Sequence, residues 1–364
     1  MKVFSLIALC VFLVPFFGVC ANASENMYDE IFDVLSPETE KLLESFGITG
    51  DVQENFTEVS VEKAFDTVLG IFRGELISPV KYLGVCLALM FISSQLSQLF
   101  SVAGSVGSLS KRISLLCVMF SIVSMSAGIF SQCSSSLLTT KDMMLVLIPI
   151  FAGVVSFGGD IALAMSFNTV AFSFAETVAI FFNGVFPLLC TVMTAVTSAS
   201  AINPLIKLDG VGKTLSKAVN VIMAFISGIF VAVLSIRGVI AGAADTVAIR
   251  GVRFIIGNSV PVVGSAIGEA LNSVVAGISL MKNTVGMVGI AAVIVINLPV
   301  IIKVAVWKGA LYFISLCADM LDLPEIRSFS ENMNGVLSVI TGALFFVSFV
   351  FIISIAIILT VSKG

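Results

Sequence analysis

The stretch VLSVITGALFFVSFVFIISIAIILTV, residues 336–361, decides the fold class of this protein. It contains no Asp, Glu, Lys or Arg. As an α-helix it would be about 39 Å long, which exceeds the hydrocarbon core of a bilayer, about 30 Å thick. A chain in lipid must satisfy its backbone polar groups internally, so an apolar run of this length predicts a membrane-spanning helix.

Further apolar stretches precede this run along the chain. The whole sequence is 58% hydrophobic and 12% charged, with a mean hydropathy of +1.12. Soluble domains carry about 25% charged residues, so this composition favours an all-α, polytopic membrane protein. The predicted spans are about 82–101, 113–133, 219–242, 284–302 and 336–361.

Other apolar stretches contain helix-breaking residues. Residues 143–202 include Pro149, Gly158-Gly159-Asp160, Asn183-Gly184 and Pro187. This pattern predicts either three short helices or one span followed by a re-entrant hairpin. Residues 254–281 and 305–318 are interrupted in a similar way.

The interrupted segments recur at a nearly constant offset, which favours an internal duplication. Pro149 and Pro261 are 112 residues apart, and each precedes Gly and then an acid, Asp160 or Glu269. Leu208-Asp209 and Leu321-Asp322 repeat at an offset of 113. The repeats would cover about 113–225 and 226–361. Chance similarity between apolar segments is the alternative.

Six residues are the candidates for a polar pathway or for a structural role. Transporters and channels place their pathway at paired broken helices, so Asp160, Glu269, Pro149 and Pro261 are candidates for it. The alternative places the two acids in loops at the membrane surface. Arg237 and Asp245 are eight residues apart, about 12 Å along a helix, and cannot pair within it. We expect them to serve the structure of the membrane domain.

The N-terminal region differs from the rest of the chain. Residues 1–23 are typical of a signal peptide, with Lys2, an apolar stretch and Ala21-Asn22-Ala23 as cleavage site. An uncleaved first membrane helix remains the alternative. Residues 24–80 hold 13 acids and 3 bases and predict an acidic extracytoplasmic segment with a short amphipathic helix. Residues 81–364 form the predicted membrane domain.

Several enzyme classes do not fit the residues present. The chain has no His, and none of its seven Cys forms a CxxC pair, so metal and cofactor sites are not expected. The segment Gly210-Val211-Gly212-Lys213-Thr214 lacks the first glycine of a phosphate loop, since position 207 is Lys. Gly158-Gly159-Asp160 lacks the glycine that the intramembrane aspartyl protease motif requires before it. The sequence predicts a protein that is not an enzyme and does not bind nucleic acid.

The chain also resembles the stage III sporulation protein AE family of endospore-forming bacteria, over about residues 80–361. The motifs that carry the resemblance are Leu234-Ser235-Ile236-Arg237-Gly238, Ala244-Asp245-Thr246, Arg250, Arg253-Phe254, Asn258-Ser259-Val260-Pro261-Val262-Val263-Gly264, Gly268-Glu269-Ala270-Leu271 and Lys282-Asn283-Thr284-Val285-Gly286. The resemblance implies a multi-pass protein of the mother-cell membrane around the forespore. It further implies membership of a channel assembly that joins the two compartments and supports late forespore development.

The expected partners are the lipid bilayer and other membrane proteins of that assembly, with further copies of the chain as an open alternative. Two other functions remain open at this point. One is a self-sufficient secondary transporter, with coupling near Asp160 and Glu269. The other is a membrane scaffold that anchors partner proteins.

Overall fold

The computed structural model describes residues 41, 61–99, 106–157, 161–202, 209–259 and 264–361. From residue 61 onward, all of these residues are helical except for the turn at 321–323, and no strand occurs among them. The elements are α4 (Val61–Leu99), α5 (Val106–Phe157), α6 (Ile161–Ile180), the π-helical turn η4 (Phe181–Val185), α7 (Phe186–Ile202), α8 (Asp209–Ser259), α9 (Gly264–Met320) and α10 (Pro324–Val361).

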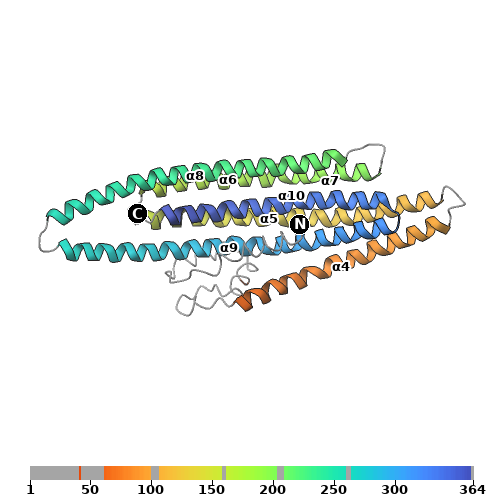
Figure 1. Ribbon diagram of the computed structural model, residues 1–364, viewed down its shortest axis with the longest axis horizontal. Helices are drawn as coiled ribbons and strands as arrows, with labels where there is room; N and C mark the ends of the chain where they lie inside the picture. The colour runs from red at the N-terminus through yellow and green to blue at the C-terminus, as the bar shows by residue number, and fades with distance from the viewer. Residues whose placement is uncertain are drawn as a thin grey trace.

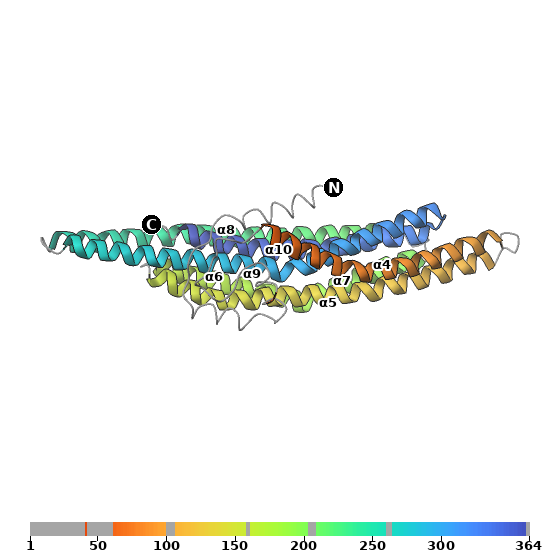
Figure 2. The ribbon, with the colours of Figure 1, turned by 90° about the horizontal axis from the view of Figure 1, so that it is seen from below.

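These helices form an elongated bundle in which they run roughly side by side (Figures 1 and 2). α5, α8 and α10 run in one direction, and α4, α6–α7 and α9 run in the other. Six helical segments of the described residues are long and apolar enough to cross a membrane. The prediction of an all-α, polytopic membrane protein is confirmed.

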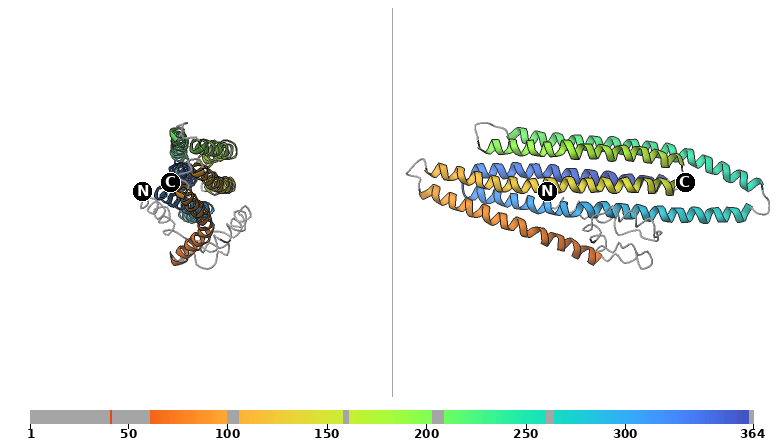
Figure 3. Two further views of the ribbon diagram at one scale, coloured as in Figure 1. Left: turned by 90° about the vertical axis from the view of Figure 1, so that its right-hand side faces the viewer. Right: turned by 180° about the vertical axis from the view of Figure 1, so that it is seen from behind.

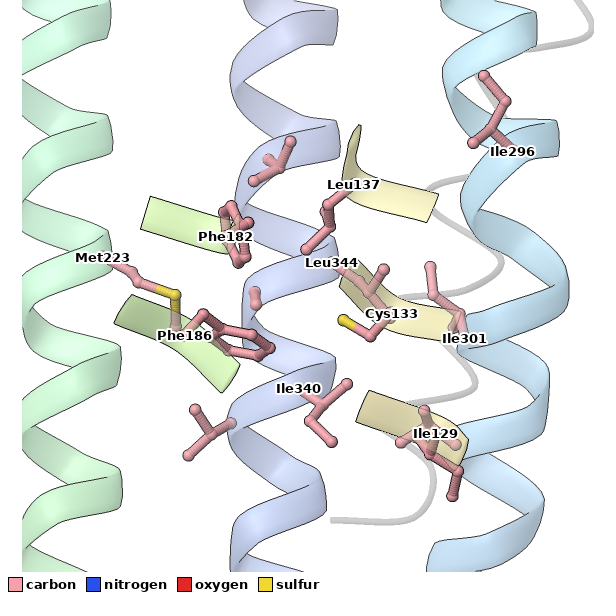
Figure 4. Close-up of a cluster of buried hydrophobic side chains, with 14 of the residues drawn as sticks. Ile129, Cys133, Leu137, Phe182, Phe186, Met223, Ile296, Ile301, Ile340 and Leu344 are labelled. Carbon is pink, nitrogen blue, oxygen red and sulfur yellow. The ribbon is translucent and has the colours of Figure 1, made fainter. Parts of the chain in front are cut away.

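Helix α9 has the most buried apolar part of the described helices and contacts α4, α5 and α10. In its most apolar part 78% of the residues are buried, against 22% in the corresponding parts of α4 and α8. The end-on view in Figure 3 shows α4 and α8 at the outside. The core between α5, α7, α9 and α10 is filled by large side chains, including those of Leu137, Phe186, Ile301 and Leu344 (Figure 4).

Of the helix breaks expected within residues 143–202, those at Pro149 and at Asn183-Gly184 and Pro187 are absent, and this part of the prediction was wrong, whereas α5 ends at Phe157 and the antiparallel α6 begins at Ile161. Helix α5 continues through Pro149 to Phe157. Pro149 cannot donate to the carbonyl of Leu145, but one missing bond is tolerated in a membrane helix. Asn183 and Gly184 lie in the η4 turn, where Phe186 N–H donates to Phe181 O across five residues. The π-helical turn therefore joins α6 and α7 into one continuous helical segment.

The predicted duplication agrees with the structure at one point and stays a prediction. The offset of 113 relates Asp209, which begins α8, to Asp322, which lies in the turn just before α10. Because α8 and α10 run in the same direction and pack together, such repeats would be parallel. The proposed boundary at 225/226 falls inside α8. Residues 158–160 and 260–263, which the comparison also needs, lie outside the described residues.

The turn between α9 and α10 is a Schellman motif, which satisfies carbonyls at the end of α9. Leu323 N–H donates to Ala318 O at 2.9 Å, and Asp322 N–H donates to Asp319 O at 3.3 Å. Asp322 has φ of 56° and takes the left-handed position that Gly usually occupies. From the neighbouring hairpin, Lys111 Nζ donates to Asp322 O at 3.3 Å, and this contact fastens α5 to the turn.

Candidate functional site: a polar layer within the bundle

The structure describes only some of the six candidate residues that the sequence predicted. Pro149 on α5 and Arg237 on α8 are both exposed, and Arg237 has no hydrogen bond or ion pair with a described residue. Asp160 and Pro261 lie outside the described residues. Asp245 and Glu269 lie in residues 241–259 and 264–284, the parts of α8 and α9 in which the structure describes the helical backbone but no side chains. The pathway hypothesis built on these residues stays untested.

The structure instead places a group of buried polar side chains between α5 and α9. Asn297 on α9 is fully buried, and its Nδ2 donates to Thr140 Oγ1 at 2.9 Å and to Val293 O at 2.9 Å. Ser136 Oγ lies 2.9 Å from Asn297 Oδ1 and 3.1 Å from Ile296 O, and both oxygens are acceptors. Thr140 Oγ1 donates to Ser136 O at 2.9 Å.

This cluster, formed by Ser136, Thr140 and Asn297, is a brace for α9. Two residues after Asn297 comes Pro299, which lies inside the helix and leaves Val295 O without its usual donor. Side chains of neighbouring helices can stabilise such a weakened turn in a membrane protein. Every polar atom of the three side chains has a partner, so the cluster fixes α5 against α9 and leaves no donor free for a ligand.

Ionisable side chains lie close to the brace along the chain and elsewhere on α9. Lys141, one residue beyond Thr140, pairs with Asp142. Further along α9, Lys303 Nζ lies 3.5 Å from Glu75 on α4, and the two side chains are 21% and 28% exposed. The described part of the chain contains no group of three or more metal-binding side chains. These pairs hold helices together and show no metal-binding geometry.

Sequence reasoning missed the brace. Residue 297 fell inside a predicted span, and Lys141-Asp142 fell in an expected connection between helices. A signal was present, because an Asn two residues before a Pro in an apolar run needs a partner from another helix. The run Ser134-Ser135-Ser136 and the pair Thr139-Thr140 offered that partner, 157 to 161 residues away along the chain.

Comparison with known proteins identifies the family of the chain. The sequence model of one family, described as stage III sporulation protein AE, matches residues 46–362. The chain belongs to that family. A curated relative, the stage III sporulation protein AE of Bacillus subtilis (strain 168), is 26% identical over 227 residues.

The alignment with the relative covers 61% of this chain and 56% of the relative, so it spans just over half of the relative's length. No solved structure matches the chain. The family assignment confirms the resemblance found in the sequence, and it supports a role in sporulation for a multi-pass membrane protein. The brace and the packed bundle around it are therefore properties of a sporulation protein.

Proposed function

We propose that this chain is a non-enzymatic membrane subunit of the channel assembly that joins mother cell and forespore. It would act in the mother-cell membrane around the forespore and would be required for late forespore development. The observation that carries the proposal is the family match over residues 46–362.

The packing of the bundle supports a subunit of an assembly. The centre of the bundle is occupied by side chains of α9, and the polar groups of the brace are all paired with one another or with the backbone. A protein that transports a solute on its own needs a passage lined by polar groups inside its bundle. In this bundle, a passage is better placed between chains than through the middle of one chain.

The proposal is tested by deleting the gene and restoring it at a second site. In the deletion strain we expect forespores to complete engulfment and then fail to express a late forespore reporter. The restored gene should return both the reporter and heat-resistant spores. A deletion strain that forms spores at the normal frequency would exclude a required role.

A second experiment separates a subunit from a self-sufficient transporter. The purified chain is reconstituted alone into lipid vesicles loaded with a mixture of small metabolites and ions. We expect no efflux above that of protein-free vesicles. Saturable efflux of one solute by the chain alone would favour the transporter instead.

A further inference from the structure

The outer face of α5 differs from the other outer faces of the bundle. Between residues 121 and 156 no large hydrophobic side chain of α5 is exposed. The exposed residues there are Ser124, Ala127, Gly128, Ser131, Gln132, Ser135, Asp142 and Pro149. The outer face of α8 instead exposes large apolar side chains, among them Phe225, Ile229, Val233 and Ile236.

The neighbouring helix α6 adds polar groups to this surface, interleaved with the exposed apolar side chains of Met165, Phe172 and Ile180. α5 and α6 pack together as a hairpin and lie at one side of the bundle (Figure 3). Between its apolar positions α6 exposes Thr169, Ser173, Glu176 and Thr177. We call the exposed residues of α5 from 124 to 142 and these four residues of α6 the α5–α6 face.

Two carboxylates of the α5–α6 face lie at the same height along the bundle. Phe151 on α5 and Phe167 on α6 pack edge to face, with ring centroids 6.1 Å apart. Asp142 precedes Phe151 by nine residues, and Glu176 follows Phe167 by nine residues. Because the two helices run in opposite directions, these equal spacings place Asp142 and Glu176 level with each other.

Helix α8 shows where this level falls relative to a membrane. Residues 218–236, between Lys217 and Arg237, carry no charge and are about 28 Å long as a helix, close to the thickness of a hydrocarbon core. Phe174 on α6 stacks on Phe230 at 3.9 Å. Glu176, two residues further along the antiparallel α6, is therefore level with about residue 228 of α8, near the middle of the uncharged stretch.

The register between α5 and α9 gives the depth of Asp142 independently. The uncharged stretch of α9, residues 283–302, is about 30 Å long. The hydrogen bond between Ser136 and Asn297 sets the register between α5 and α9. Six residues beyond Ser136, Asp142 is level with about residue 291, again near the middle of the stretch. Both carboxylates thus lie at the mid-depth that a bilayer around α8 and α9 would have.

Lipid is a poor neighbour for this face because of its charged and amide groups. The hydroxyls alone would be tolerated: Thr169, Ser173 and Thr177 each donate to a carbonyl four residues earlier in α6. Gln132 and Glu176, however, have no partner among the described residues, and the Asp142 side chain is 51% exposed although it pairs with Lys141. An ionised group at the bilayer centre costs about 2.5 kcal/mol or more.

We propose that the α5–α6 face meets water inside the membrane and is the surface that this chain contributes to an aqueous pathway. The proposal rests on the proposed function, because other chains must supply the remaining walls. Direct packing of the same face from a second copy is disfavoured, since it would bring acids at one level against each other. Water both separates these charges and solvates Gln132.

Cysteine accessibility tests this proposal. Ser135→Cys, Ser173→Cys and Thr177→Cys probe the α5–α6 face, and Phe225→Cys and Ile229→Cys are matched controls on α8. Membranes from sporulating cells, opened so that both surfaces are reached, are treated with a small charged methanethiosulfonate or with a lipid-soluble maleimide. Labelling is measured above that of the parent chain, whose own cysteines give the background.

We expect the charged reagent to modify the three α5–α6 positions at least about ten times faster than the two α8 positions, which should react with the maleimide only. Three probe positions keep the test valid if one variant is missing from the membrane. Reaction of the α5–α6 positions with the maleimide alone would show that they face lipid. Reaction with neither reagent would show that they are covered by protein.

Either of those two results overturns the water-facing assignment. Neither result contradicts the proposed function, which is tested by the sporulation of the deletion strain. Conversely, fast reaction with the charged reagent in a strain whose deletion sporulates normally would retain the water-facing surface and reject the role in sporulation.

Discussion

Helices α8 and α9 look alike in sequence and occupy opposite environments. They contain 51 and 57 residues, and their most apolar parts have mean hydropathies of 2.5 and 2.6. Yet 22% of that part is buried in α8 and 78% in α9. Lipid tails are as apolar as a protein core, so hydropathy selects helices for the membrane without choosing which of them becomes central.

Small residues and hydrogen-bonding residues make that choice. A Cβ atom on Gly289 of α9 would lie 2.9 Å from Leu147 on α5 and 3.1 Å from Ile355 on α10, so three helices meet at this glycine. A Cβ atom on Gly228 of α8 would meet nothing within 4 Å. Asn297 adds hydrogen bonds from α9 to α5, and no described interhelical hydrogen bond holds the uncharged stretch of α8.

The largest expected effect is therefore a contrast between two glycines. Gly289→Leu should lower the stability of the protein by about 3 kcal/mol or more, because a buried three-helix contact cannot accept the added volume. Gly228→Leu, on an exposed face, should be neutral or slightly stabilising, because Gly is a poor helix residue. Thermal unfolding of the two purified variants in detergent compares them, and equal midpoints would contradict the central position of α9.

The second effect concerns the brace. Asn297→Leu keeps a large side chain but removes the hydrogen bonds between α9 and α5, so we expect a loss of about 1 to 2 kcal/mol. Ser348→Ala is the matched control in α10. Its hydroxyl is buried without a partner, and its removal should leave stability unchanged or raise it slightly. A harmful Ser348→Ala beside a harmless Asn297→Leu would reverse our assignment of the two sites.

A smaller effect is expected at the pair that joins α4 to α9. Lys303→Met leaves Glu75 partly buried without its cation, and we expect a loss of about 1 kcal/mol. Adding Glu75→Gln should recover part of that loss, because the unpaired charge is then gone. The unfolding midpoints of the single and double variants measure this coupling, and strictly additive losses would show that the two side chains do not interact.

The smallest effect belongs to the outer face of α8. Phe225→Leu should change stability by less than about 0.5 kcal/mol, because the side chain is 68% exposed within the bundle and meets lipid or a partner. The abundance of this variant in sporulating cells should equal that of the parent chain. Reduced abundance with an unchanged unfolding midpoint would indicate that α8 is covered by another subunit.

The sequence alone was sufficient for the helical class and for the location of apolar helices. The stretch 336–361, for example, lies within α10. It could not predict continuity through Pro149, because a proline ends a helix in water and is tolerated in a membrane bundle. The partners of Asn297 were also out of reach, since Thr140 is 157 residues away and periodicity within one helix does not report contacts between helices.

For the candidate site, sequence and structure answer different questions. Paired acids and prolines at a constant offset suggested a pathway. Asp160 and Pro261 lie outside the described residues, so the structure does not test that pathway. The α5–α6 face could not be recognised from sequence because both Ser and Thr occur in every described α-helix. Only burial distinguishes the Ser and Thr residues that face outward at mid-depth from those that fill the core.

The π-helical turn at Phe181–Val185 sets the rotational phase of all that follows it in the same helical segment. The buried residues Val178, Phe182, Phe186 and Cys190 succeed one another at intervals of four. In a regular α-helix each such interval would turn the side chain about 40° further from the core. The wider turn compensates for this drift, and its glycine, Gly184, is exposed. If this turn tightened into a regular α-helix with all its residues kept, α7 would rotate by about 100° relative to α6. A single π-helical turn thus keeps the two halves of a 42-residue helical segment facing the same neighbours.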